Sequence, residues 1–119
     1  MSLRASDVFK TTKARGKPER DIQRAIIGYL RSIGALVAVT DAGAAYRAGS
    51  WGADTVPAGW PDITGLLPDG RFIGVECKAP GGRQSPAQKF MAQEIAHRCG
   101  LYVPAYSIDD VREAIERHD

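Results

Sequence analysis

The chain has 119 residues, of which 44% are hydrophobic and 25% charged, and its formal net charge is +2. This length suits one domain, and this composition excludes a disordered or collagen-like chain. The longest apolar run, Ala35 to Val39, is far shorter than the roughly 20 residues that cross a bilayer, and we see no secretory leader before it. Two cysteines and two histidines are too few and too scattered for a zinc site. We therefore expect a single cytoplasmic domain without membrane contact.

The charges are unevenly distributed along the chain. Residues 1–20 contain only two acidic residues beside six basic ones, which are Arg4, Lys10, Lys13, Arg15, Lys17 and Arg20. We interpret residues 1–18 as a basic N-terminal arm that suits a polyanion. A solvated tail without a partner is the alternative. Residues 19–119 then form the single domain.

The first half of that domain predicts one helix and one strand. Apolar residues from Ile22 to Ile33 recur with helical spacing, so a helix is expected from Glu19, just after Pro18, to a stop at Gly34. The segment Ala35–Val39 is short and apolar, which predicts a buried strand. Residues 41–59 show no periodicity and predict a long loop, and loops of that length are usually functional or disordered.

A hairpin is expected next. The strand candidates Ile63–Leu67 and Arg71–Lys78 flank Pro68-Asp69-Gly70, which suits a three-residue hairpin turn with a left-handed glycine.

The last third predicts a helix, a strand and a helix. Ser85 and Pro86 open a helix that runs to about Cys99, with Gly100 as its stop. The strand Leu101–Ala105 follows. Ser107, with Asp110 three residues later, resembles a capping box that opens the final helix. The predicted class is α/β, a small mixed sheet of about four strands flanked by helices in the order αβββαβα.

The hairpin register brings charged residues together. If Leu67 pairs with Arg71, Asp62 lies opposite Glu76, and strand alternation places Lys78 on the same face. Two carboxylates this close repel unless a cation lies between them, and Mg²⁺ is held by one or two carboxylates. The cluster therefore predicts metal-assisted phosphodiester hydrolysis. A cross-strand salt bridge without a metal is the alternative.

The residues of these segments, in this order, resemble the motifs of a known family. The sequence reads Gly59-Trp60-Pro61-Asp62, then Val75-Glu76-Cys77-Lys78-Ala79-Pro80-Gly81-Gly82, then Gln88. This order resembles the PD-(D/E)XK nuclease superfamily and, within it, the VRR-NUC branch, whose short stand-alone members occur in bacteria and phages. The resemblance spans Glu19 to about Ile115 and implies a restriction-endonuclease-like core.

The resemblance also implies roles for individual residues. Asp62 and Glu76 would bind the metal, Lys78 would be the catalytic lysine, and the carbonyl of Cys77 would be a further metal ligand. Gln88 would face the site from the following helix, and the alternative for it is an exposed helix residue. Glu19, in an E-x-x-x-Q pattern with Gln23, would join the metal ligands, and the alternative is surface polarity near a helix N-terminus.

The function implied is an endonuclease that uses Mg²⁺, or Mn²⁺, to hydrolyse DNA by direct attack of water. By the same resemblance, branched DNA such as a four-way (Holliday) junction is the first choice of substrate in DNA repair. A homodimer suits such a two-fold substrate, and a helicase or another replication or repair protein is a possible partner. A restriction-type or nicking nuclease is one alternative, and a non-catalytic DNA-binding or helicase-partner module is the other.

Four further residues are candidates for contact with nucleic acid through stacking or phosphate pairing, with loop packing as the equal alternative. They are Arg47, Trp51, Trp60 and Arg83.

Overall fold

The computed structural model describes residues 5–40 and 56–118. Its elements follow the expected αβββαβα order: α1 (Ala5–Ser32), β1 (Leu36–Val39), β2 (Ile63–Leu66), β3 (Phe72–Cys77), α3 (Pro86–His97), β4 (Leu101–Ala105) and α4 (Ile108–Arg117). Among these residues, no helix is long and apolar enough to span a bilayer.

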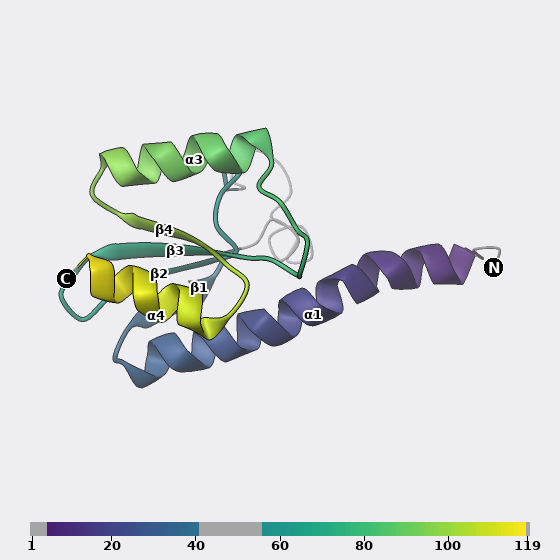
Figure 1. Ribbon diagram of the computed structural model, residues 1–119, viewed down its shortest axis with the longest axis horizontal. Coiled ribbons are helices and arrows are strands. Elements are labelled where there is room, and N and C mark those ends of the chain that lie inside the picture. Colours follow the sequence, from purple (N-terminus) through teal and green to yellow (C-terminus); the bar gives the residue numbers. More distant parts are fainter. Residues whose placement is uncertain (1–4, 41–55, 119) are drawn as a thin grey trace.

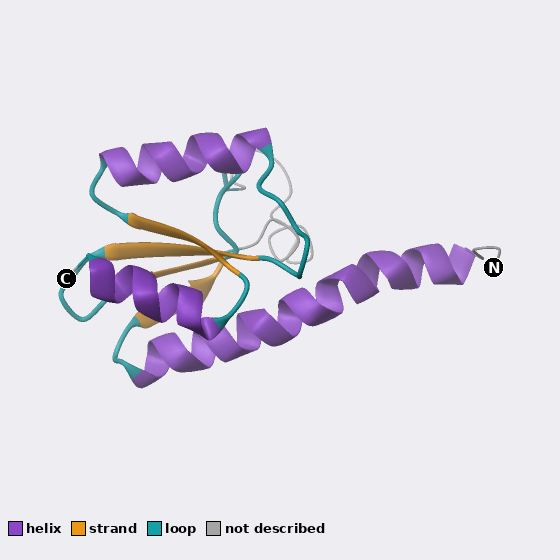
Figure 2. Cartoon of the chain, in the orientation of Figure 1, coloured by secondary structure: helices purple, strands orange, loops and turns teal. Residues whose placement is uncertain are grey.

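The four strands form one mixed sheet in the order β1-β2-β3-β4. The first two pairings are antiparallel, and β3 pairs with β4 in parallel. Helix α3 covers one face of the sheet, and α1 and α4 cover the other (Figures 1 and 2). The predicted α/β class and mixed sheet are therefore confirmed.

The side chains of strand β3 are hydrophobic on one face of the sheet, and the other face carries the charged residue Glu76. Ile73, Val75 and Cys77 are buried in the core together with Ile26 of α1 and Val111 of α4. Because successive side chains in a strand point to opposite faces, Glu76 lies on the face that α3 covers. One face of β3 thus packs against α1 and α4 in the hydrophobic core, and the face towards α3 carries the polar side chain.

Helix α1 is longer than expected. It begins at Ala5 and passes through Pro18, whereas the sequence pattern placed its start at Glu19. A proline inside a helix loses one hydrogen bond and kinks the chain, but the helical turns on both sides can continue. The expected basic arm is therefore the first part of α1, and this part extends away from the sheet (Figure 1).

Strand β1 differs from the prediction in its burial. It lies at the edge of the sheet, where β2 is its only partner among the described strands, and Leu36 is 72% exposed. Its short apolar run resembles that of a buried strand, but an edge position leaves its α3-side residues uncovered. The expected buried strand is thus an exposed edge strand.

The helix ends are also partly different. Ser85 caps α3 as predicted, but Cys99, not Gly100, adopts the left-handed conformation, with φ of 66°. Gly100 is instead packed tightly, because a Cβ there would lie 2.8 Å from Ile95 Cγ2. At α4, the Asp110 side chain accepts a hydrogen bond from the Tyr106 N–H, so the expected box with Ser107 does not form.

Candidate active site

The hairpin that carries the candidate site has the predicted register. Ile63 pairs with Val75, and the Leu67 N–H donates to the Arg71 carbonyl at 2.9 Å. Gly70 closes the turn with φ of 91° and donates to the Leu67 carbonyl at 2.8 Å. The next step along the hairpin beyond Ile63 places Asp62 beside Glu76.

The Asp62 side chain takes the place of a backbone acceptor at the end of the hairpin. The pairing of β2 with β3 ends at Ile63 and Val75, and beyond it the Cys77 N–H donates to Asp62 Oδ2 at 2.8 Å. The Thr40 N–H donates to the Asp62 carbonyl at 2.7 Å, and its hydroxyl donates to the Pro61 carbonyl at 2.9 Å. The Asp62 carboxylate is therefore fixed beside β3 through the backbone on both sides.

Glu76 is the most buried charged residue of the site, with 1% of its surface exposed. The Tyr102 hydroxyl donates a hydrogen bond to Glu76 Oε1. Lys78 Nζ lies 2.7 Å from Glu76 Oε2, but this contact lacks hydrogen-bond alignment, so Oε2 is a buried oxygen without a hydrogen-bond partner. A buried charge requires compensation, and among the described side chains the Lys78 ammonium supplies it to this oxygen.

Lys78 is held by two oxygens from the segment that follows β3. Its Nζ donates to the Arg83 carbonyl at 2.9 Å and to Gln88 Oε1 at 3.0 Å. The same Gln88 oxygen accepts the Ser85 N–H at 2.8 Å, while the Gln88 N–H donates to Ser85 Oγ. One glutamine thus caps α3 and orients Lys78, which agrees with its predicted location facing the site.

Tyr102 is a member of the site that the sequence analysis missed. It lies on β4 beside Gly74 in the parallel register, and burial, then the hydrogen bond to Glu76 and the charges of Glu76 and Asp62, raise the pKa of its hydroxyl. Gln84 has a smaller opposite effect. The charges of Asp62 and Glu76 thus both favour the protonated form of the Tyr102 hydroxyl. The chain passes through α3 between β3 and β4, and no local sequence signal gives the register of two parallel strands connected in this way.

The site offers oxygen ligands of the kind that Mg²⁺ prefers. The buried Glu76 Oε2 and the Asp62 carboxylate are oxygens of that kind, and the Cys77 carbonyl points away from β4, towards the side of β2, where Asp62 lies. This direction follows because the Lys78 N–H donates to Ala105 on β4, and a trans peptide directs the preceding carbonyl the opposite way. Within the described ranges, no three His, Cys, Asp or Glu residues form a metal-binding group, and the role of Glu19 as a further metal ligand stays a prediction.

Two of the four residues predicted to contact nucleic acid, Trp60 and Arg83, are among the described residues. Arg47 and Trp51 lie outside the described residues, as does most of the loop 41–59. Trp60 is half-buried and packs against Phe72, with ring centroids 6.0 Å apart. Arg83 is exposed beside the catalytic candidates, and its carbonyl accepts the Lys78 hydrogen bond.

Two glycines allow close approaches of the backbone around the site. A Cβ on Gly59 would lie 2.2 Å from the Ala87 carbonyl oxygen in the first turn of α3, and a Cβ on Gly74 would lie 2.5 Å from Pro61 Cγ. Gly59 thus lets the segment leading to Asp62 lie against α3. Gly74 lets Pro61 lie directly on β3 next to Glu76.

Comparison with known proteins agrees with this architecture. A solved structure described as a VRR_NUC domain matches with a TM-score of 0.64 and 20% sequence identity, over 86% of this chain and 98% of that chain. No family model and no curated protein sequence matches the chain. The resemblance inferred from the motifs is thereby confirmed at the level of structure, and the chain has the fold of a VRR_NUC domain.

Proposed function

We propose that the protein is a divalent-metal-dependent endonuclease that hydrolyses DNA phosphodiesters. The observation that carries this proposal is the convergence of Asp62, Glu76 and Lys78 at one end of β3, within a fold shared with a VRR_NUC domain. A buried carboxylate–ammonium pair contributes little to stability for the desolvation it costs. Its presence beside a second carboxylate is explained by chemistry rather than by folding.

Each residue has a definite task in this proposal. Asp62, Glu76 and the Cys77 carbonyl would hold Mg²⁺ or Mn²⁺, and the bound ion would polarise the phosphate and make water a better nucleophile. Lys78, oriented by Gln88 and the Arg83 carbonyl, donates a hydrogen bond to the phosphate oxygen on which negative charge develops. The attacking water gives one proton to bulk solvent, its oxygen bonds to phosphorus as the bond to the leaving oxygen breaks, and the leaving oxygen takes up one proton from bulk solvent.

The rest of the chain supports a polyanionic substrate. The early part of α1 extends from the body (Figure 1) and carries Lys10, Lys13, Arg15 and Lys17 in its sequence. Phosphate contacts by such residues give affinity without sequence preference. We propose branched DNA, such as a four-way junction, as the preferred substrate, a homodimer as the acting unit, and a helicase or another replication or repair protein as a further partner.

A cleavage assay with a charge-removing variant tests the proposal. We expect the purified protein to cut DNA when Mg²⁺ or Mn²⁺ is present and not in EDTA, on a panel of linear, flapped and four-way junction DNAs. The variant Glu76→Gln removes one negative charge with little change in volume, so cleavage should fall by at least about 10²-fold, the size typical of lost transition-state stabilisation.

Glu94→Gln is the matched control, because Glu94 pairs with Arg98 on α3, away from the carboxylate pair. It should cut like the unsubstituted protein. Equal cutting by Glu76→Gln would contradict the proposed mechanism. DNA binding without any cutting by the unsubstituted protein would instead favour the non-catalytic binding module.

A further inference from the structure

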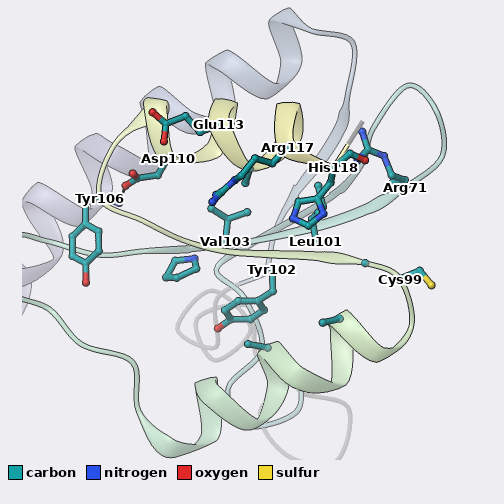
Figure 3. Close-up of a pocket in the computed structure, with 15 residues that line it drawn as sticks. Arg71, Cys99, Leu101, Tyr102, Val103, Tyr106, Asp110, Glu113, Arg117 and His118 are labelled. Carbon is teal, nitrogen blue, oxygen red and sulfur yellow. Dashed lines mark hydrogen bonds between the residues drawn. The ribbon is translucent and has the colours of Figure 1, made fainter.

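Tyr102 reaches the candidate metal site from the adjacent strand. Leu101 and Val103 point towards α4, whereas Tyr102 points to the other side of the sheet, towards α3 (Figure 3). Its partner in the parallel register is Gly74, which has no side chain. Glu76 lies two residues further along the same face of β3, and the Tyr102 hydroxyl reaches its Oε1.

This contact makes the two oxygens of Glu76 unequal. Oε1 accepts the Tyr102 hydrogen bond, whereas Oε2 is buried and lacks an aligned donor, although Lys78 Nζ is 2.7 Å away. A carboxylate with both oxygens free could rotate about its terminal torsion, which is broad for glutamate. The Tyr102 hydroxyl on Oε1 and the Lys78 ammonium beside Oε2 together restrict that rotation.

We infer that Tyr102 is a positioning residue for metal binding: its hydroxyl fixes Glu76 Oε1, so that Oε2 is the oxygen presented to the divalent cation. This inference rests on the proposed function. Groups that orient a ligand carboxylate typically change metal affinity by about 10- to 100-fold when they are removed.

The test compares Tyr102→Phe with Tyr106→Phe. Each variant loses one hydroxyl, but the Tyr106 hydroxyl donates to the Gly82 carbonyl at 2.7 Å, not to a carboxylate. We expect Tyr102→Phe to weaken Mn²⁺ binding, measured by calorimetry without DNA, by about 10-fold or more. Tyr106→Phe should leave the Mn²⁺ affinity unchanged. Thermal unfolding in EDTA checks that both variants fold.

Cleavage kinetics supply the second readout. For Tyr102→Phe, the Mg²⁺ concentration for half-maximal cleavage should rise in proportion to the lost affinity, while the rate at saturating Mg²⁺ largely recovers. Unchanged Mn²⁺ affinity in an active protein would overturn the inference alone, and so would a rate loss that no Mg²⁺ concentration recovers. If the unsubstituted protein neither binds Mn²⁺ nor cuts DNA, the proposed function fails, and this inference with it.

Discussion

Glu76 and Lys78 form a buried ion pair, so removing one of them leaves the charge of the other less compensated. Their side chains are 1% and 11% exposed, and their charged atoms lie 2.7 Å apart. Lys78 has two further oxygen partners, whereas Glu76 has the Tyr102 hydroxyl. Removing Lys78 therefore leaves the buried Glu76 carboxylate with one neutral donor. We expect this to cost more unfolding free energy than removing the Glu76 charge, because Lys78 keeps two oxygen partners.

For Lys78→Met, we expect cleavage to disappear while DNA binding is largely retained, because one phosphate contact is a small part of an electrostatic footprint. The same variant should lose about 3 kcal/mol of unfolding free energy, since removing one partner of a buried pair typically costs 3–5 kcal/mol. Urea denaturation measures the stability, and binding and cutting are measured at one salt concentration.

Adding Glu76→Gln to Lys78→Met should recover much of the lost stability without restoring cleavage, because the uncompensated charge is gone. Equal loss of binding and cutting in the single variant would make Lys78 a DNA-binding residue instead.

At the scale of elements, the site depends on how closely the segment before Asp62 lies against α3. Gly59 has φ of 80° and would place a Cβ 2.2 Å from the Ala87 backbone oxygen. Ala87 precedes Gln88, the residue that orients Lys78. A side chain at position 59 would therefore push the two halves of the site apart.

Gly59→Ala should destabilise the protein by more than Gly70→Ala, and the difference isolates the effect of this close approach. Both glycines have positive φ, but a Cβ at Gly70 meets nothing within 4 Å. Gly70→Ala should thus cost only the roughly 1–2 kcal/mol of a left-handed alanine. Chemical denaturation of the two variants measures the difference, and equal stabilities would show that the segment at Gly59 yields without cost.

Strand β4 forms the second edge of the sheet, and its Pro104 limits pairing with a further strand. The Ala105 carbonyl accepts the Lys78 N–H and so faces β3, which makes the nitrogen of Pro104 face outwards. A proline there removes no ladder hydrogen bond and blunts the edge against pairing with another strand. A cleft of about 660 Å³ follows this edge (Figure 3).

At the scale of the whole molecule, a chain of 119 residues offers little surface for a branched duplex, and two-fold dimers are the commonest assemblies. We expect a homodimer at micromolar concentration, so that two sites at a fixed separation make paired nicks in a symmetric junction. Sedimentation with and without junction DNA measures this. A protein that stays monomeric in both conditions would exclude paired nicking and leave a simple nicking nuclease.

The sequence by itself determined the local features. The turn Pro68-Asp69-Gly70 set the hairpin register, and Ser85-Pro86 set the start of α3, because each depends on residues adjacent in the chain. The placement of Asp62 beside Glu76 follows from that turn, and the grouping of Lys78 with them follows from strand alternation. These relations needed no knowledge of distant contacts.

Only the tertiary structure decided the relations between distant segments. The pairing of β4 with β3 across α3 brings Tyr102 to Glu76, and parallel crossovers leave no local trace of their register. The exposure of β1 depends on its place at the edge of the sheet, and the passage of α1 through Pro18 shows that one lost hydrogen bond does not end a helix. Local propensity fixes which elements form, whereas packing between elements fixes which side chains meet.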